Sequence, residues 1–545
     1  MIMTRKKKWL IGVGLSLVLV MAALFVAAFF LSKHFEPYIR EQAIEYLRRR
    51  FDSEVELAGL HVRMPEFSPV RLLLTRGRGA WARVDGENLL MRHKGRRDVP
   101  AMFGIRKFSF QVDLGSLFGP QKIVSFVKLD GMEIHVPPKG QRPDLSRGDE
   151  SKDQLAQSNS PQSTVLIEEV IVRDATLVIL PNDKSKVPLR FDIDRLRLES
   201  AGLNVAMKYD ATLTNPKPPG DIQSQGSFGP WSAEEPGDTP LAGTYSFRNA
   251  DLGVFPAIAG VLNSTGTFEG TLSTLNARGE AAVPDFRLKK SGNPVPLVTR
   301  FEVLVDGTNG DTILKPVHAT LGTTDFTTSG GVIKHKNDPR RTIGLEVSVP
   351  RGNLADFLRL AMKGPPLMEG KIVLHSKIDI PPLSGKVKEK LLLDGHFEVL
   401  RGKFLRSAIQ DQVDALSRRG QGQPKNTEID EVISLMGGTF KLEDQVMSFN
   451  PLSFSVPGAA FDLVGSYDIY RDVLDFRGTM KLQAKVSQTM TGWKRWVLKP
   501  ADPFFAKEGA GTFLRIKVEG PANQPKFGLD RGHKEPEQRA KSSQK

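Results

Sequence analysis

The sequence predicts a mainly β protein with a few helices, behind a single N-terminal membrane-spanning helix. Two observations give the β prediction. Apolar and polar residues alternate through many short segments, and 50 glycines and 36 prolines separate these segments. A third observation gives the membrane helix, because residues 9–31 contain no charge. At about 1.5 Å per residue, a helix of that length exceeds the roughly 30 Å hydrocarbon core of a bilayer.

The orientation of this helix follows from the basic tail at residues 1–8. Arg5 and the lysines at 6–8 precede the apolar segment, so the positive-inside rule places the N-terminus in the cytoplasm and the bulk of the chain across the membrane. A cleaved signal peptide is the alternative. Its apolar region is usually shorter, about 7–15 residues, and ends at small residues. Here the segment ends in Phe29, Phe30 and Leu31, and we therefore expect an uncleaved anchor.

Residues 33–52 are predicted to form a neck helix. Ile44 and Leu47 belong to a set of apolar residues that recur at helical spacing, which predicts a helix packed on the first strands. Arg48, Arg49 and Arg50 are candidate contacts for anionic lipid headgroups. The alternative is that they form a solvated, cationic helix end.

The remaining residues are predicted to form antiparallel strands. In residues 107–114, every second side chain is apolar, which is typical of a strand with one apolar face and one polar face. We predict an N-terminal β region at 53–240 with a polar loop at 139–163, a central β region at 241–440, a C-terminal β module at 441–530 and a disordered tail at 531–545. Helices are expected near 353–362, 403–418, 427–436 and 488–498.

One part of the predicted sheet shows an internal repeat. Residues 123–131 resemble residues 167–175, 44 positions later, and each copy precedes a further alternating segment. This pattern predicts a repeated strand–turn–strand unit in a sheet that grows by addition.

The sequence argues against an enzyme and against metal or cofactor binding. It has no cysteine, and none of its nine histidines lies in an H-E-x-x-H motif. Gly77–Ala82 lacks the helix that a dinucleotide site needs, Gly364–Lys371 has the wrong spacing for a phosphate loop, and no G-x-S-x-G is present. The net charge of +14 is not accompanied by an aromatic-basic motif or by finger spacing, so no nucleic-acid partner is expected.

Two segments resemble a known family. The first is the strand, loop, strand and L-D-G succession of Ile105–Val136. The second is a series of short C-terminal motifs: Val456-Pro457-Gly458-Ala459, Gly465-Ser466-Tyr467, Leu474-Asp475-Phe476-Arg477-Gly478, Ala484-Lys485-Val486-Ser487, Thr491-Gly492-Trp493-Lys494 and Lys517–Gly520 followed by Asn523–Pro525. In this order they resemble the AsmA family of Gram-negative envelope proteins and its C-terminal module.

The resemblance implies an elongated antiparallel sheet curved into an open groove, anchored in the inner membrane with its bulk in the periplasm. Such a protein would carry phospholipid between the inner and outer membranes or support outer-membrane assembly. The implied partners are membrane phospholipids, with an outer-membrane or periplasmic protein as a further candidate. The alternative function is that of a non-conducting scaffold that assists outer-membrane protein assembly. Glycan binding by an exposed sheet face is a weaker alternative, because the chain has only five Trp and six Tyr.

The alternating segments supply the candidate groove residues. They are Phe108, Phe110, Val112, Ile134, Val136, Val303, Val305, Leu345 and Val347. Alternation alone favours an ordinary sandwich core for these side chains, whereas the resemblance favours a groove in which acyl chains lie out of water.

Overall fold

The structure of this chain is a computed structural model. It describes residues 40–41, 44–45, 47–48, 53–63, 79–98, 100–113, 115–116, 121–136, 164–180, 189–201, 206–230, 232, 236–290, 292–307, 310–334, 341–382, 385–492, 494–506, 511–522 and 524–530. The predicted basic tail, the membrane helix at 9–31, the polar loop at 139–163 and the tail at 531–545 lie outside these residues. Within the described part, no helix combines the length and the apolar character needed to cross a bilayer.

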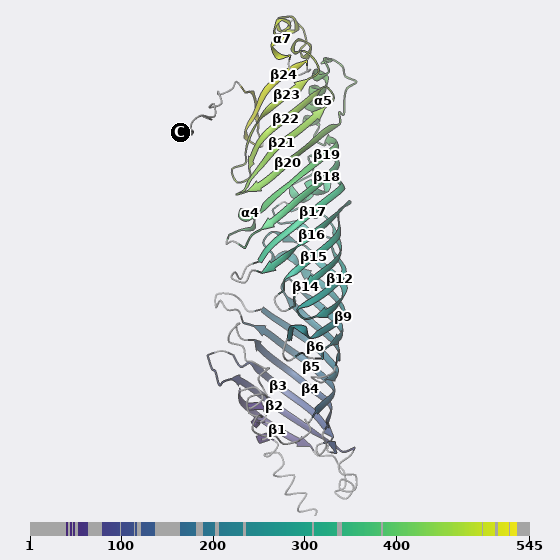
Figure 1. Cartoon of the computed structure of the whole chain (residues 1–545), viewed down its shortest axis with the longest axis vertical. Helices are drawn as coiled ribbons and strands as arrows, with labels where there is room; N and C mark the ends of the chain where they lie inside the picture. Colours follow the sequence, from purple (N-terminus) through teal and green to yellow (C-terminus); the bar gives the residue numbers. More distant parts are fainter. Residues whose placement is uncertain are drawn as a thin grey trace, which may run out of the picture. The chain divides into compact units, whose positions relative to one another are not determined.

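The chain is mainly β, as predicted, and forms two compact units (Figure 1). Unit 1 comprises residues 1–250 and 265–275, and unit 2 comprises residues 251–264 and 276–545. Strands β11 (Val261–Thr271) and β12 (Thr274–Val283) contribute to both units.

Unit 1 is built from nine consecutive strands. They are β1 (Ser53–Arg63), β2 (Trp81–His93), β3 (Phe103–Asp113), β4 (Gln121–Val136), β5 (Thr164–Ile179), β6 (Leu189–Ala201), β7 (Met207–Pro216), β8 (Pro219–Phe228) and β9 (Pro240–Asp251), with a short 3₁₀ turn at Pro236–Asp238. Each strand pairs with the next one, and every pair is antiparallel except β4 with β5.

The parallel β4–β5 pair corrects the predicted strand–turn–strand repeat. Each copy of the repeat lies in one continuous strand, and the two copies run side by side, with Asp130 paired to Arg173. Gly131 and Asp174 have φ angles of +64° and +49°. A left-handed residue can bend a strand without reversing it, so the Asp130–Gly131 pair that resembles a hairpin turn is only a kink. The prediction of a uniformly antiparallel sheet is therefore wrong at this pair.

Unit 2 continues the antiparallel pattern. Its main strands are β14 (Leu297–Val305), β15 (Thr312–Leu321), β16 (Thr324–Lys334), β17 (Arg341–Asn353), β18 (Met368–Ile380), β19 (Leu392–Phe404), β20 (Ser434–Glu443), β21 (Val446–Val456), β22 (Ala459–Asp468), β23 (Val473–Leu482), β24 (Thr512–Pro521) and β25 (Lys526–Leu529). Two short strands, β10 (Ile258–Ala259) and β13 (Arg287–Leu288), pair separately, next to a 3₁₀ turn at Leu252–Val254.

β-Bulges interrupt every strand pair from β14–β15 to β21–β22. Pro316, Pro350 and Pro451 lie within three of these interruptions. Proline has no N–H for the ladder, so it is tolerated in a strand mainly at a bulge or an edge. A bulge bends its strand and increases the local twist, so this series of bulges bends strand after strand of unit 2.

The described residues of unit 2 form five helices between strands, one of which, α4, is a single turn. They are α3 (Leu354–Ala361), α5 (Ser407–Gly420), α6 (Lys494–Leu498) and α7 (Asp502–Phe505), with a single turn α4 at Val387–Lys390 and 3₁₀ turns at Val486–Thr489 and Lys499–Ala501. Helices were expected near 353–362 and 403–418, where α3 and α5 occur. The helix expected at 427–436 is wrong, because these residues form turns and the start of β20. Of the helix expected at 488–498, only α6 and a 3₁₀ turn are present.

A buried carboxylate fixes α3 on the β15–β16 hairpin. Asp356 is 2% exposed. It accepts hydrogen bonds from the backbone N–H of Thr323 at 2.9 Å and from the hydroxyls of Thr323 and Thr324 at 2.8 and 2.9 Å. The Asn353 side chain caps the helix by accepting from the N–H of Ala355 at 3.1 Å. The helix is therefore held by directional bonds as well as by its apolar side.

Asp356→Ala should weaken the attachment of α3, because it leaves the buried Thr324 hydroxyl and the Thr323 N–H without their acceptor. We expect a loss of about 1–3 kcal/mol in the local unfolding free energy. Hydrogen exchange of peptides covering α3 measures it. The exposed Asp379 of β18 gives the matched control, and equal exchange in Asp356→Ala and Asp379→Ala would contradict this account.

Candidate functional site

In unit 1, one face of the sheet is continuously apolar. Backbone pairing aligns two rows of inward side chains across successive strands. The first row is Val84, Phe110, Val127, Val170, Leu198 and Tyr209, and the second is Gly86, Phe108, Leu129, Val172, Leu196, Ala211, Ser224 and Tyr245. We call this surface the apolar face of unit 1.

Unit 2 has an equivalent face, also made of two rows. The first row is Val303, Leu314, Gly330, Leu345, Ile378, Leu393, Leu442, Met447, Tyr467 and Leu474, and the second is Thr328, Val347, Ser376, Gly395, Phe440, Phe449, Gly465, Phe476, Val518 and Phe527. We call this surface the apolar face of unit 2. No residue of these rows carries a charge.

The structure places the predicted residues as follows. Phe108, Phe110, Val112 and Ile134 lie on the apolar face of unit 1, and the rings of Phe108 and Phe110 stack at 6.4 Å. Val303, Val305, Leu345 and Val347 lie on the apolar face of unit 2. All eight are partly exposed. Val136 pairs with Ile179 in the backbone ladder, but its side chain lies outside the described part.

On the apolar face of unit 2, glycines leave space for the aromatic rings of neighbouring strands. The rings of Phe397 and Phe440 lie 6.2 Å apart, and those of Phe449 and Phe476 lie 5.9 Å apart. A Cβ at Gly395 would come within 2.9 Å of the Phe440 ring and within 2.3 Å of the backbone oxygen of His375. The missing side chain therefore makes room for the ring to lie against the sheet. Sequence analysis did not identify these glycines, although Gly395 has the same strand parity as Leu393 and Phe397.

Helices cover only parts of the two faces. In unit 1 the described neck residues are helical, and Ile44 and Leu47 pack against a cluster that contains Val55, Val84 and Leu89. Phe108 and Phe110 border the same cluster. The predicted packing of the neck on the first strands is thus present in the described residues. Of the candidate headgroup contacts, Arg48 is exposed, and Arg49 and Arg50 lie outside the described part.

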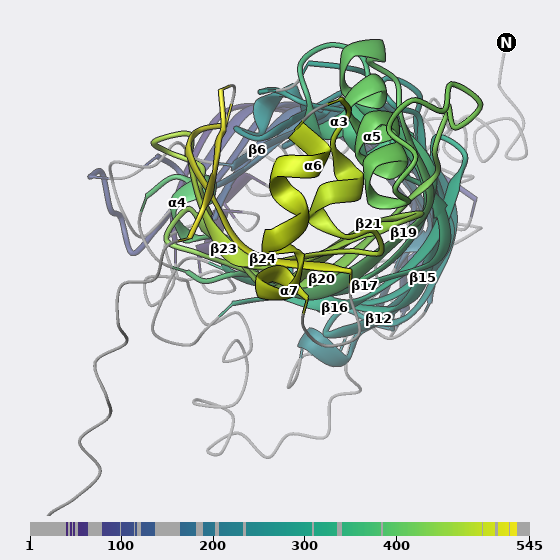
Figure 2. The same cartoon turned by 90° about the horizontal axis from the view of Figure 1, so that it is seen from above.

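In unit 2, α3 and α5 cover one end of the strands. Leu354 and Phe357 of α3 pack with Ile372 and Val399, and Val413 and Leu416 of α5 belong to a second cluster over β21–β23. Figure 2 shows α5 and α6 on the same side of β19–β24. Val349 and Val399 are at most 2% exposed, whereas Leu345 and Val347 on the same face are partly exposed. The helices account for only part of this difference, because Leu442 and Phe476 in the same rows are also buried, at 4% and 6% exposure, outside the clusters under α3 and α5.

No large second sheet covers these faces. Among the described residues, the other sheet consists of the short pair β10–β13 alone. The sandwich core that alternation favoured is therefore not formed in the described part of the chain.

The opposite, outer face is charged. Arg197 donates to Glu169 at 2.6 Å and lies 3.2 Å from Glu199, and the hydrogen bond to Glu169 raises the pKa of Arg197. In unit 2, hydrogen bonds from Lys315 and Arg278 lower the pKa of Glu302. On the apolar face of unit 1, burial raises the pKa of the Tyr209 phenol, which bonds to Ser224 at 3.0 Å. At neutral pH the outer face is therefore ionised and the apolar face is not.

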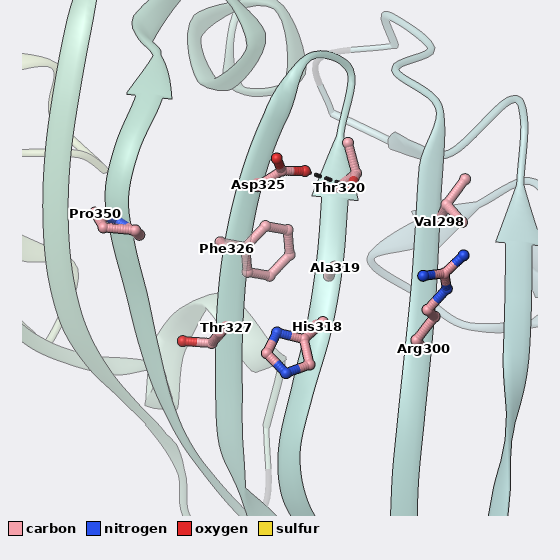
Figure 3. Close-up of a pocket in the computed structure, with 9 residues that line it drawn as sticks. All are labelled: Val298, Arg300, His318, Ala319, Thr320, Asp325, Phe326, Thr327 and Pro350. Atoms are coloured by element: carbon pink, nitrogen blue, oxygen red, sulfur yellow. Dashed lines mark hydrogen bonds between the residues drawn. The ribbon is translucent and has the colours of Figure 1, made fainter.

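A depression of about 560 Å³ lies on β14–β17 of unit 2 (Figure 3). Its polar lining residues come from the outer face, such as Arg300, His318 and Thr327. Arg300 is paired with Glu280 at 2.8 Å, and Asp325 accepts from Thr320 at 2.7 Å. The described residues contain no cluster of three or more potential metal ligands. This depression presents no reactive arrangement, so the apolar faces are the stronger candidate site.

Comparison with other proteins gives no match. Neither models of protein families, nor curated proteins, nor solved structures match this chain.

Gly395→Ala should disrupt the apolar face of unit 2. The new methyl would overlap the backbone oxygen of His375, and the resulting overpacking costs about 1–3 kcal/mol. Thermal unfolding should show a lowered midpoint. Gly528→Ala is the control, because its Cβ would meet only the Lys517 side chain, at 3.7 Å. A midpoint equal to that of the control would show that Gly395 is not needed for this packing.

Proposed function

We propose that this chain is an AsmA-like, inner-membrane-anchored periplasmic protein whose sheet curves into a groove that carries phospholipid between the inner and outer membranes. One observation supports this proposal most strongly. On the apolar face of each unit, uncharged side chains, most of them apolar, continue from strand to strand. Part of these faces is left accessible between the covering helices.

The dimensions of the faces suit acyl chains. At about 4.8 Å between strands, the eight spacings from β1 to β9 give roughly 38 Å in unit 1, and the eleven from β14 to β25 give roughly 53 Å in unit 2. Full burial of a methylene group contributes about 0.8 kcal/mol. Ten methylenes covered on one side would therefore gain roughly 4 kcal/mol, which favours retention and still permits movement along the face.

The contrast between the two faces also supports a groove. Apolar contact is non-directional, so it selects for acyl chains as a class and needs no reactive group. The ionised outer face keeps the opposite side of the same strands in water. The bulges in unit 2 bend successive strands, as a curled sheet requires, and α5 and α6 lie on the side toward which such a sheet would close (Figure 2). The predicted anchor at 9–31 would hold the N-terminal end at the membrane that supplies the lipid.

A scaffold role is the second candidate, and the edge strand β25 favours it. Phe527 and Leu529 are 77% and 52% exposed on a strand whose outer edge has no described partner strand. Such an edge can pair with a strand of another protein. This role predicts protein contacts at β25 and no lipid on the apolar faces.

Photocrosslinking should distinguish the two faces. A photoreactive residue replacing Leu129 or Leu345 should crosslink to phospholipid in cells, because both positions face the proposed groove. The neighbouring positions Lys128 and Glu346 provide matched controls on the outer face. The proposal fails if lipid adducts are absent at all four positions, or equally frequent on both faces.

A charge on the apolar face should expel lipid. Leu345→Glu introduces a carboxylate among apolar partners and should lower the amount of co-purified phospholipid at least tenfold, as expected if two or three methylenes lose their contacts at about 0.8 kcal/mol each. Ile333→Glu provides the control, because Ile333 is 45% exposed on the outer face of the adjacent strand. Mass spectrometry of extracted lipid gives the readout, and unchanged lipid in Leu345→Glu would count against the groove.

A further inference from the structure

The connection between β23 and β24 is one of two long connections between the described strands of unit 2, the other being residues 405–433 with α5 between β19 and β20. It runs from residue 483 to residue 511, whereas β22 and β23 are joined by residues 469–472. Its described residues contain the 3₁₀ turn Val486–Thr489, α6, the 3₁₀ turn Lys499–Ala501 and α7.

Buried polar contacts hold this connection in place. The Asp502 carboxylate is 9% exposed and accepts from the Ser487 N–H at 2.8 Å and from the Ser487 hydroxyl at 2.7 Å. The hydrogen bond from the Ser487 backbone lowers the pKa of Asp502, so this carboxyl is ionised at neutral pH. At the end of the connection, Thr512 donates to the carbonyl of Ala484 at 2.7 Å. These hydrogen bonds tie distant residues of the connection to one another and to the start of β24. We call this connection the platform.

The platform exposes large apolar side chains. Trp496 is 75% exposed, Val497 is 61% exposed and Met490 is 41% exposed. Isolated exposed apolar residues are common, but these three lie on α6 and directly after the 3₁₀ turn that α6 contacts, and we treat them as one patch. Exposure of these apolar side chains to water is unfavourable. We therefore expect another molecule to cover this surface when the protein functions.

The exposed charges described on this connection are those of lysines. Lys485, Lys494 and Lys499 are exposed, and the ammonium of Lys499 lies 5.6 Å from the centre of the Trp496 ring. The acidic residue described in this connection, Asp502, is buried and bound to Ser487. The patch thus combines an indole, aliphatic side chains and exposed ammonium groups.

We propose that this surface, formed by Met490, Trp496, Val497 and the lysines at 485, 494 and 499, docks on an anionic phospholipid bilayer. Indole rings favour the headgroup region because they have an apolar body and a polar N–H. Lysines add attraction to anionic headgroups. A protein partner complementary to this patch would need its own acidic rim, whereas a bilayer of anionic lipid supplies both the apolar layer and the charge. The proposal does not depend on lipid in the groove.

The absence of native cysteine permits a site-specific test in the full chain. Val497→Cys, labelled with the environment-sensitive dye NBD, is held in nanodiscs of neutral lipid and mixed with separate vesicles. We expect a blue shift and stronger emission with vesicles that contain phosphatidylglycerol, and no change with pure phosphatidylcholine. Tyr470→Cys is the matched control, because Tyr470 is 75% exposed, compared with 61% for Val497, but lies on the β22–β23 turn.

Charge reversal completes the test. Lys494→Glu combined with Lys499→Glu should weaken the vesicle response at position 497 about tenfold or more, and Trp496→Ala should reduce it independently. The proposal is overturned by an absent response, by an equal response at Tyr470→Cys, or by equal binding to neutral vesicles. It is also overturned if the dye responds only to an added envelope protein extract and not to lipid.

Discussion

The structure depends on one constraint: alternate side chains of each strand place apolar residues on one face of the sheet and charged residues on the other. Successive side chains of a strand point to opposite sides, so a one-residue slip would move apolar side chains into water and charges into the apolar rows. In this chain the separation of the two faces persists through interruptions such as those of β15–β16 and β17–β18, because residues of the apolar face pair with one another again when the ladder resumes. Leu314 and Val317, on either side of the Pro316 bulge, pair with Gly330 of the first row and Thr328 of the second row, both on the apolar face of unit 2.

The covering helices determine what the apolar face can do. Where Leu354 or Val413 packs on the sheet, the face becomes an ordinary core. Between these places it has the same composition without the cover, so the free energy of burial is available to an external apolar molecule. In the proposed function, an acyl chain would occupy the position that a covering helix takes elsewhere on the same face.

Sequence alternation predicted a good part of this arrangement. Phe108 and Phe110 could be assigned to one face because period-two patterning survives in residues 107–114, and Ile44 and Leu47 were identified by helical spacing. The parallel β4–β5 pair could not be predicted, because the Asp130–Gly131 dipeptide that kinks β4 has the composition of a hairpin turn. The glycine–aromatic contacts, such as Gly395 with Phe440, depend on register between strands, which a single sequence does not contain. The extent of the covered surface likewise depends on long-range packing of α3 and α5.

The central claim is that acyl chains occupy the accessible apolar face. A cryo-electron microscopy map of the full chain, purified with its native lipid, tests this claim most directly. The account predicts elongated density in van der Waals contact with Leu345 and Val347, on the side of the sheet that α3 and α5 flank. A map in which protein covers these side chains, or in which that face is empty while the chain retains its fold, would contradict it.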